Sequence, residues 1–347
     1  MEYLIDQSDY IPDNWKPVIK DKAMNLIMWS DWFCGLRSPE ELLHTHTSYF
    51  FNEYIFYLLG LLTFIHAYRT GSRYWFTWIG LIIHGLNTEC LTYFVPDFEN
   101  FWHSQTSVMF VGRRLPAHII LLYPMFDYTS TVTMKRLRLN WFAEGCAIGL
   151  ATVLLDIPYD ILGVKLLWWT WHDTDPNVAD RMYHVPWTSY YFHAAFAASF
   201  TWILAGARRL LVNDEYDWKL FGRELLCALL AGVGAFWLGA LQFIPIYHYF
   251  HDIHGVHSEV CTMAFLGLYA LIAWSADRKR PPLRSKQAQS GPGSSWFNEL
   301  TLLVLIHYTF YLILVWVAQP EKIASTGLHE PVGKCSSMVP VQTLSGL

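Results

Sequence analysis

Long stretches of mostly apolar residues alternate along this chain with shorter polar segments. A transmembrane helix needs about 20 such residues, and about eight stretches reach that length. They run approximately over 48–68, 74–95, 108–131, 141–163, 187–211, 223–243, 258–276 and 297–318. Charged residues interrupt the third and fourth stretches, so the number of spans could also be seven or nine. The pattern predicts an all-α fold, a polytopic transmembrane helical bundle.

The same pattern divides the chain into three parts. Residues 1–47 form an N-terminal tail, in which 25–34 is too short to span a membrane and is expected at its interface. Residues 48–318 hold the predicted transmembrane domain. Residues 319–347 form a C-terminal tail that is expected to be partly disordered.

Lysine and arginine residues are concentrated in every second loop. One set of connections carries Arg69, Arg73, Lys135, Arg136, Arg138, Arg208, Arg209, Lys219, Arg278, Lys279, Arg280, Arg284 and Lys286. The opposite connections hold Lys165 and Arg181. Because basic loops tend to remain in the cytoplasm, both termini are expected on the lumenal or extracellular side.

The composition narrows the range of partners. The chain is 53% hydrophobic and 17% aromatic, which suits aromatic belts at a membrane interface and a cavity for an apolar ligand. A net charge of -5 gives no reason to expect nucleic acid. The expected partners are the lipid bilayer and an apolar lipid, and the oligomeric state is not predicted.

A pair of carboxylates lies inside the fourth predicted span. Asp156 and Asp160 are four residues apart, so a helix places both on one face. A charge near the bilayer centre costs about 3 kcal/mol, and such residues usually face the interior of a bundle and serve a function. Pro158 between them is expected to break the helix and free backbone carbonyls. The pattern predicts a polar site inside the membrane bundle.

Glu89 is a further acid within the second predicted span. Tyr93 follows it by four residues, so a carboxylate and a phenol share one face of the helix. A functional acid and a buried glutamate bonded to a neighbouring helix fit this position equally well.

Arg113 and Arg114, near the start of the third predicted span, are also candidate substrate-binding residues. If the helix begins near residue 108, both enter the membrane and need partners such as Glu89 or Asp127. If it begins at Pro116, a natural first helical residue, both lie at the interface near lipid headgroups. The second alternative is favoured.

The segment after Asp160 is dense in aromatic and polar residues. Its candidate ligand-binding residues are Trp168, Trp169, Trp171, Tyr183 and Trp187. The tryptophans suit an interfacial belt or a wall against an apolar ligand. His193 follows inside the next span and is a candidate proton acceptor. An ordinary turn with a helix cap is the alternative for the polar residues between.

Four histidines recur at intervals of three between the sixth and seventh predicted spans. They are His248, His251, His254 and His257. Imidazoles on adjacent turns suit zinc, iron or copper, which makes a divalent metal the candidate cofactor. The run lacks the HEXXH spacing, and Gly255 interrupts a helix. An exposed histidine-rich loop and a pH-sensing loop are the alternatives.

The order of these elements resembles an uncharacterised eukaryotic multi-pass membrane family known only as a domain of unknown function. The likeness covers about residues 48–274. It lies in the motifs HGLNTE, GRRLPAHIILLYP, LLDIPYDILGVKLLWWTWHDTDP and VPWTSYYFH. These motifs are long and unusual, so they are specific to the family, but the resemblance implies no activity.

A more distant likeness is to the carotenoid hydratase family of integral membrane enzymes. That family has a glutamate in an early span, a proline entry to the next, and an acid-proline segment leading to Trp-x-Trp and a tyrosine-valine-proline turn. The corresponding places hold Glu89, Pro116, Asp156 with Pro158, Trp169 with Trp171, and Tyr183 with Val185 and Pro186. His184 stands where glycine is expected. The resemblance implies a similar fold more than a shared reaction.

Three functions fit these observations. The first is a membrane enzyme that acts on an isoprenoid-like or other lipid by acid-base chemistry. In a dry cavity Asp156 or Asp160 keeps a proton and donates it to an alkene, while Glu89 or His193 positions water or takes the proton back. Tryptophan faces then shield a developing carbocation. The alternatives are a proton-coupled transporter, which needs the same acids, and a non-catalytic membrane scaffold.

Overall fold

The computed structural model describes residues 12–172, 175–212, 216–279 and 297–323. Over these residues it is almost entirely helical. The long helices are α4 (Thr47–Thr70), α5 (Arg73–Phe94), α8 (Trp141–Lys165), α9 (Trp187–Leu211), α10 (Phe221–Leu241), α11 (Ser258–Arg278) and α12 (Glu299–Val317). The shorter ones are α2 (Lys16–Phe33), α3 (Pro39–Thr45), α6 (Ala117–Tyr123) and α7 (Thr129–Met134). The all-α prediction is confirmed.

Two π-helical segments and several single 3-10 turns complete the helical part. The π segments are η2 (Pro124–Tyr128), which joins α6 to α7 in one continuous run, and η6 (Ile244–Ile253), which follows α10. The 3-10 turns are η1 (Pro96–Phe98), η3 (Lys135–Leu137), η4 (Pro176–Val178), η5 (Trp218–Leu220) and η7 (Pro320–Lys322).

Short strands fold the connections at one end of the bundle into three small antiparallel sheets. They are β1 (Cys34–Leu36), β2 (Phe101–His103), β3 (Val108–Phe110), β4 (Leu115–Pro116), β5 (Trp169–Trp171), β6 (Arg181–Met182) and β7 (Val185–Pro186). The sheet orders are β1-β3-β4, β2-β5 and β6-β7. Pairing of β2 with β5 sets His103 opposite Trp169.

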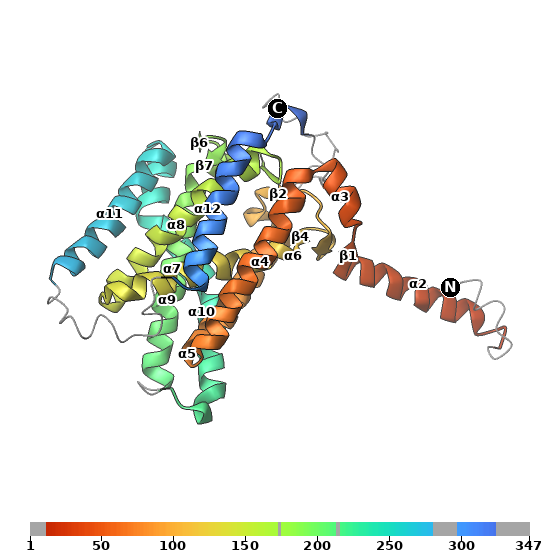
Figure 1. Ribbon diagram of the computed structural model, residues 1–347, viewed down its shortest axis with the longest axis horizontal. Helices are drawn as coiled ribbons and strands as arrows, with labels where there is room; N and C mark the ends of the chain where they lie inside the picture. The colour runs from red at the N-terminus through yellow and green to blue at the C-terminus, as the bar shows by residue number, and fades with distance from the viewer. Residues whose placement is uncertain (1–11, 173–174, 213–215, 280–296, 324–347) are drawn as a thin grey trace.

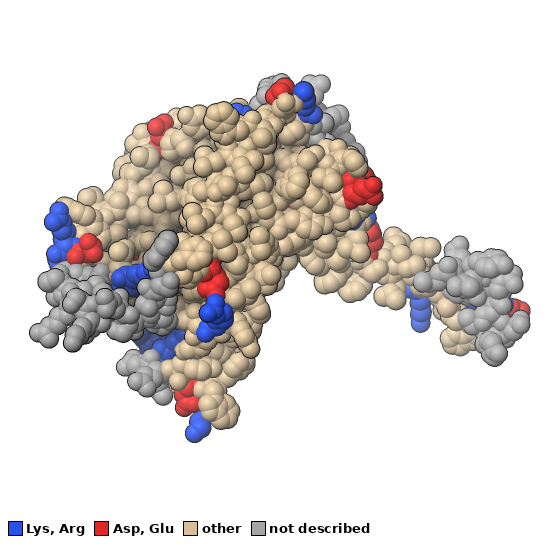
Figure 2. Space-filling view, viewed as in Figure 1, with Lys and Arg blue, Asp and Glu red and all other residues tan. Residues whose placement is uncertain are grey.

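Within the part of the chain that the structure describes, five helical runs are long and apolar enough to cross a membrane. They are α4, α8, the run Trp218–Leu241 that contains α10, α11 and α12. Figure 2 shows a face with a broad uncharged surface across the body of the molecule, with charged side chains above it and below it. Apolar side chains such as Val315 and Trp316 of α12 are largely exposed on the bundle. Helices of this composition with an apolar exterior indicate a membrane protein.

The helices α5 and α9 have a lower hydropathy because they carry several polar side chains. Those side chains are buried within the bundle. Buried His84 and Glu89 lie on α5, and buried Ser189 and Thr201 lie on α9. Both helices are central, since α9 packs against α8 and α10, and α10 also packs against α5. In Figure 1, α12 and α4 run side by side on one face, and α11 flanks the bundle. The two central helices therefore bring buried polar side chains into the interior of the bundle.

Pro158 does not break its helix, in contrast to the prediction. The helix α8 continues through it, which leaves the carbonyl of Leu154 without the amide donor of residue 158. The hydroxyl of Tyr308 on α12 donates to that carbonyl at 2.8 Å. Nε2 of His307 lies 2.8 Å from the next carbonyl, that of Leu155. Side chains of α12 thus supply the donors that keep the helix intact.

The N-terminal helix α2 projects from the body of the molecule, as Figure 1 shows. It contains residues 25–33 of the segment that was expected at the interface, and none of its residues is buried. Its exposed apolar residues include Met28, Trp29 and Trp32. Residues 280–296 and 324–347, the latter being most of the predicted C-terminal tail, lie outside the described residues.

Candidate functional site: an acidic cavity with aromatic walls

A cavity of about 370 Å³ lies among α5, α6, α8, α9 and α10, beneath the β2-β5 sheet. Its polar lining includes Glu89, His103, Asp160 and His193. The aromatic lining comprises Phe98, Phe101, Tyr123, Tyr159, Trp169, Trp171, Phe192, Phe196, Phe236, Phe243 and Tyr247. A small number of convergent polar groups in an apolar pocket of this size is typical of a small-molecule site.

Two acids and a histidine come together at this cavity. Asp156 and Asp160 lie on one face of α8, as their spacing predicts, and His193 comes from the neighbouring α9. One ligand atom from each of the three lies within 4.8 Å of the others. Nε2 of His193 is 3.3 Å from Oδ1 of Asp156. The hydroxyl of Ser189 donates to Oδ2 of Asp160 at 2.6 Å.

The side chain of Asp156 is fully buried. Neither of its oxygens accepts a hydrogen bond from the described part of the chain. A buried carboxylate is costly unless a partner or a cation compensates it. Asp156 is therefore the group in this site with the strongest need for a proton or a cation.

Glu89 is the third carboxylate of the site. Its two oxygens accept hydrogen bonds from Tyr93 at 2.8 Å and from Tyr123 at 2.9 Å. Glu89 and Asp160 line the same cavity, so a ligand there would meet both carboxylates. Tyr123 lies on α6, and no local pattern predicts its contact with Glu89.

His103 also lines the cavity, 3.9 Å from Glu89. Burial, and secondarily the charge of Arg114, lowers the pKa of His103 to about 3. The imidazole is therefore neutral at physiological pH, and its two ring nitrogens offer one hydrogen-bond donor and one acceptor. Sequence reasoning missed this residue, because its position depends on the pairing of β2 with β5.

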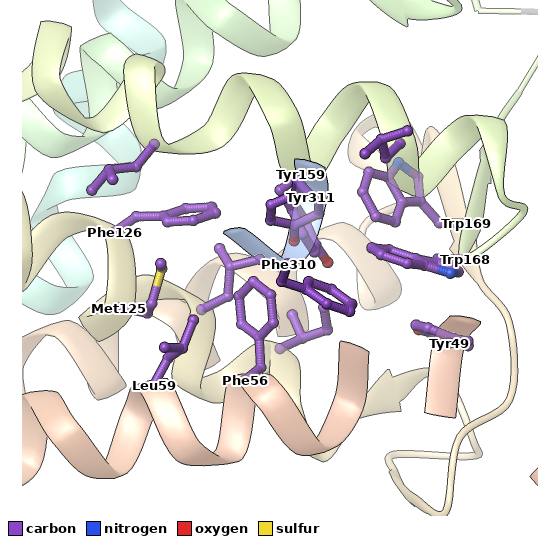
Figure 3. Packing of buried hydrophobic residues seen from close by; sticks show 14 of the residues in the cluster. Tyr49, Phe56, Leu59, Met125, Phe126, Tyr159, Trp168, Trp169, Phe310 and Tyr311 are labelled. Atoms are coloured by element: carbon purple, nitrogen blue, oxygen red, sulfur yellow. The ribbon is translucent and has the colours of Figure 1, made fainter. Parts of the chain in front are cut away.

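The predicted aromatic residues divide into two groups. Trp169 and Trp171 line the cavity, and Tyr159 stacks on Trp169 with ring centroids 4.7 Å apart. Figure 3 shows this stack beside Trp168, which lies over Tyr49 in the hydrophobic core. The indole of Trp168 donates to Ser48. Trp168 therefore packs behind the cavity wall.

Tyr183 and Trp187 are placed away from the cavity. The side chain of Tyr183 is 72% exposed, and the left-handed backbone at this residue belongs to the β6-β7 turn. Trp187 begins α9 and packs against Tyr190. Neither residue contributes to the cavity lining.

Arg113 and Arg114 lie in the turn between β3 and β4, because the helix begins only at Ala117. Arg113 pairs with Asp31 of α2 at 2.8 Å, and Arg114 pairs with Glu99. Both line a separate, open groove between α2 and this turn, of about 430 Å³. The arginines therefore lie outside the bundle interior, which agrees with the favoured alternative.

The four histidines, two in η6 and two between η6 and α11, are not brought together as one ligand set. His248 and His251 each lie within 2.7 Å of Asp252, and His257 is 3.2 Å from Asp180. The ring of His254 packs instead against Tyr249. Among the described residues, the side chains that converge closely enough to hold a metal are Asp156, Asp160 and His193.

The mouth of the cavity lies beside this histidine segment. Asn177 and His248 both line the cavity and are exposed to solvent. Asp180, just before β6, connects this segment to α11, because its carboxylate accepts a hydrogen bond from the backbone amide of Ser258. His248 is thus close to the acidic cavity, but at its entrance.

Comparison with known proteins identifies the family and goes no further. No curated protein and no solved structure matches the chain. The resemblance to carotenoid hydratases therefore stays a prediction. One sequence-family model matches residues 1–347. The chain belongs to this family, which is described as a domain of unknown function, DUF7802.

Proposed function

We propose that this protein is an integral membrane enzyme of eight spans that performs acid-base chemistry on an apolar, isoprenoid-like lipid. The observation that carries the proposal is the cavity in which Glu89, Asp160 and His193 face aromatic walls. Acids are rarely placed inside a membrane bundle without a function. Aromatic walls fit a polyene, sterol or prenol better than a polar solute.

The eight spans of the proposal are α4, α5, the run α6-η2-α7, α8, α9, α10, α11 and α12. Five of them qualify by apolar length alone. The other three carry the polar side chains of the interior, which lowers their hydropathy. The basic loops at Arg138 and Arg209 would then be cytoplasmic, and the cavity mouth would open on the lumenal or extracellular side.

In the proposed chemistry the polar residues have two roles, according to their position in the cavity. Asp156, Asp160 and His193 form an acidic centre that protonates or polarises the reacting group of the lipid. Glu89 exchanges a proton with the substrate or with water, and its two tyrosine donors hold it in place. Closely spaced buried carboxyl groups do not ionise together easily, which favours a retained proton.

A proton-coupled transporter would use the same acids, but the opposite end of the bundle argues against it. The carboxylate of Glu224 on α10 accepts from Arg73 of α5 at 2.6 Å and from Arg208 of α9 at 2.9 Å. Glu224 is 1% exposed. Transport would require this buried network to open, whereas an enzyme needs access from one side only.

The test is mass spectrometry of lipids that copurify in mild detergent. Wild type is compared with the Asp156→Asn/Asp160→Asn variant, after confirmation that the variant is folded. The exposed substitution Asp252→Asn serves as a matched acid-to-amide control. A polyene, sterol or prenol that is enriched in one sample, or chemically altered between wild type and the double variant, supports the proposal. Bulk phospholipid alone in all samples contradicts it.

A further inference from the structure

We infer that Asp156, Asp160 and His193 bind a divalent transition metal of the zinc type at the wall of the cavity. The inference rests on the proposed function, because it assigns the same acidic centre. It specifies how that centre acts: through a bound cation, with Glu89 left as the proton-exchanging group. The metal content is measurable whether or not the substrate is known.

The geometry of the three residues is the first support. Ligand atoms about 2.1 Å from a tetrahedral zinc ion lie about 3.4 Å from one another. Nε2 of His193 and Oδ1 of Asp156 are 3.3 Å apart. The third ligand atom, from Asp160, completes a group that fits within 4.8 Å.

The second support is that the polar contacts of Asp156 within the described residues are with its two proposed co-ligands, the imidazole of His193 and the carboxyl group of Asp160. This side chain is fully buried, and in the part of the chain that the structure describes neither oxygen accepts a hydrogen bond. No lysine or arginine is among the described residues that line the cavity. One divalent cation with two carboxylates and a neutral imidazole gives a centre of zero net charge. Such a centre is the arrangement that an apolar interior tolerates best.

The ligand types favour zinc over the hard cations. Calcium requires six to eight oxygen ligands and magnesium about six, several of them commonly water. Zinc accepts both carboxylate oxygen and imidazole nitrogen as ligands, and its reactive sites commonly hold three protein ligands. The hydroxyl of Ser189, which donates to Asp160, is a fitting outer contact that orients a ligand carboxylate.

The open position of the metal would face the cavity. Asp160 and His193 both line it, as does Glu89. Zinc sites with three protein ligands leave a fourth position for water or substrate. A lipid whose alcohol, carbonyl or ester oxygen occupies that position is therefore a better candidate than a pure hydrocarbon. The metal narrows the proposed substrate class to oxygen-bearing lipids.

The experiment measures zinc in the full chain, purified in detergent with an affinity tag that contains no histidine. Elemental analysis is expected to find about one zinc ion per wild-type chain and less than about a tenth of that in Asp156→Asn or His193→Gln. The control His251→Asn/His254→Asn, in the exposed histidine segment, is expected to keep its zinc. Chelator-treated wild type is expected to regain about one equivalent when zinc alone is added.

Two results would overturn the metal site. One is wild type that contains no zinc and takes up none after addition. The other is zinc that survives both site substitutions but disappears in the histidine control. The fold of each variant is checked by its chromatographic profile, and the zinc titration of stripped wild type needs no variant at all.

The same samples separate this inference from the proposed function. If the lipids differ between wild type and the aspartate variant while no zinc binds, the metal inference fails and the lipid enzyme remains. If zinc binds and only bulk phospholipid copurifies, the metal site stands and the lipid proposal fails.

Discussion

At the residue scale, the site depends on how Glu89 is held. Tyr93 and Tyr123 donate to its two oxygens from different helices, and His103 approaches from β2. Two donors on one buried carboxylate fix its direction and reduce the cost of burying it. Glu89 therefore faces the cavity in one orientation, which a proton-exchanging group requires.

Replacing Tyr123 with phenylalanine tests this arrangement. The substitution removes one donor from a buried carboxylate, so we expect the folded state to lose about 1–3 kcal/mol. Thermal unfolding in detergent would measure the loss. Tyr183→Phe is the matched control, because the Tyr183 side chain is 72% exposed and outside the cavity. Equal midpoints for the two variants would contradict the prediction.

Histidines outside the membrane spans give the protein a pH dependence. Burial lowers the pKa of His172 to about 4, and burial together with Arg114 lowers that of His103 to about 3. In the unfolded chain a histidine has a pKa of about 6.5. As the pH falls below that value, the unfolded state takes up protons that the folded state does not, so stability decreases toward pH 4.

We therefore expect a thermal midpoint that is nearly independent of these groups above pH 7 and that falls between about pH 6.5 and pH 4. His172→Asn removes one of the two groups and should make the acid slope shallower. Midpoints measured across this pH range for wild type and variant check the sign. An unchanged slope in the variant would show that His172 does not contribute.

At the element scale, the continuity of α8 depends on hydrogen bonds from α12. Pro158 cannot donate to the carbonyl of Leu154, and the hydroxyl of Tyr308 does so instead. His307 serves the adjacent carbonyl of Leu155. This second helix keeps α8 continuous where it carries the two acids, so the geometry of the site depends on an element that contributes no side chain to the cavity lining.

A double-mutant cycle of Pro158→Ala and Tyr308→Phe measures this dependence. In wild type, Tyr308→Phe leaves the carbonyl of Leu154 without its donor and should cost about 1 kcal/mol. In the Pro158→Ala background residue 158 has an amide that can bond to that carbonyl, so the same change should cost much less. The coupling is read from thermal midpoints of the four proteins. Additive effects would contradict it.

Local patterns could predict the helices but not the loops. The predicted spans 141–163 and 187–211 correspond closely to α8 and α9, because a run of apolar residues between capping and breaking residues is a local signal. The spacing of Asp156 and Asp160 is also local. The approach of His103 to Glu89 requires β2 to pair with β5 across a large sequence separation, and no periodicity reports such a contact.

The outcome at Pro158 has the same explanation. Its own sequence predicts a break, and the structure has a continuous helix because Tyr308 supplies the missing donor from far along the chain. Likewise, the spacing of the four histidines predicted a metal-ligand set. In the structure His251 contacts Asp252 and His257 contacts Asp180 instead. In both cases contacts with residues that a local pattern does not include determine the structure.

At the scale of the whole molecule, the two ends of the bundle differ. One end holds the buried network of Arg73, Arg208 and Glu224. The other end holds the small sheets and the cavity mouth, with Asn177 and His248 exposed. The site is thus reached from one side, and the basic loops predict that this side is lumenal or extracellular.

Cysteine labelling tests both the topology and the mouth. In a background without the six natural cysteines, Asn177→Cys and His248→Cys should react with a membrane-impermeant maleimide on intact cells or sealed vesicles that present the lumenal or extracellular side. Arg209→Cys, exposed near the opposite end, should react only after permeabilisation. Because His248 lines the mouth, a bulky label there should also reduce the amount of copurifying apolar lipid. The reverse labelling pattern would place the mouth in the cytoplasm and invert the proposed topology.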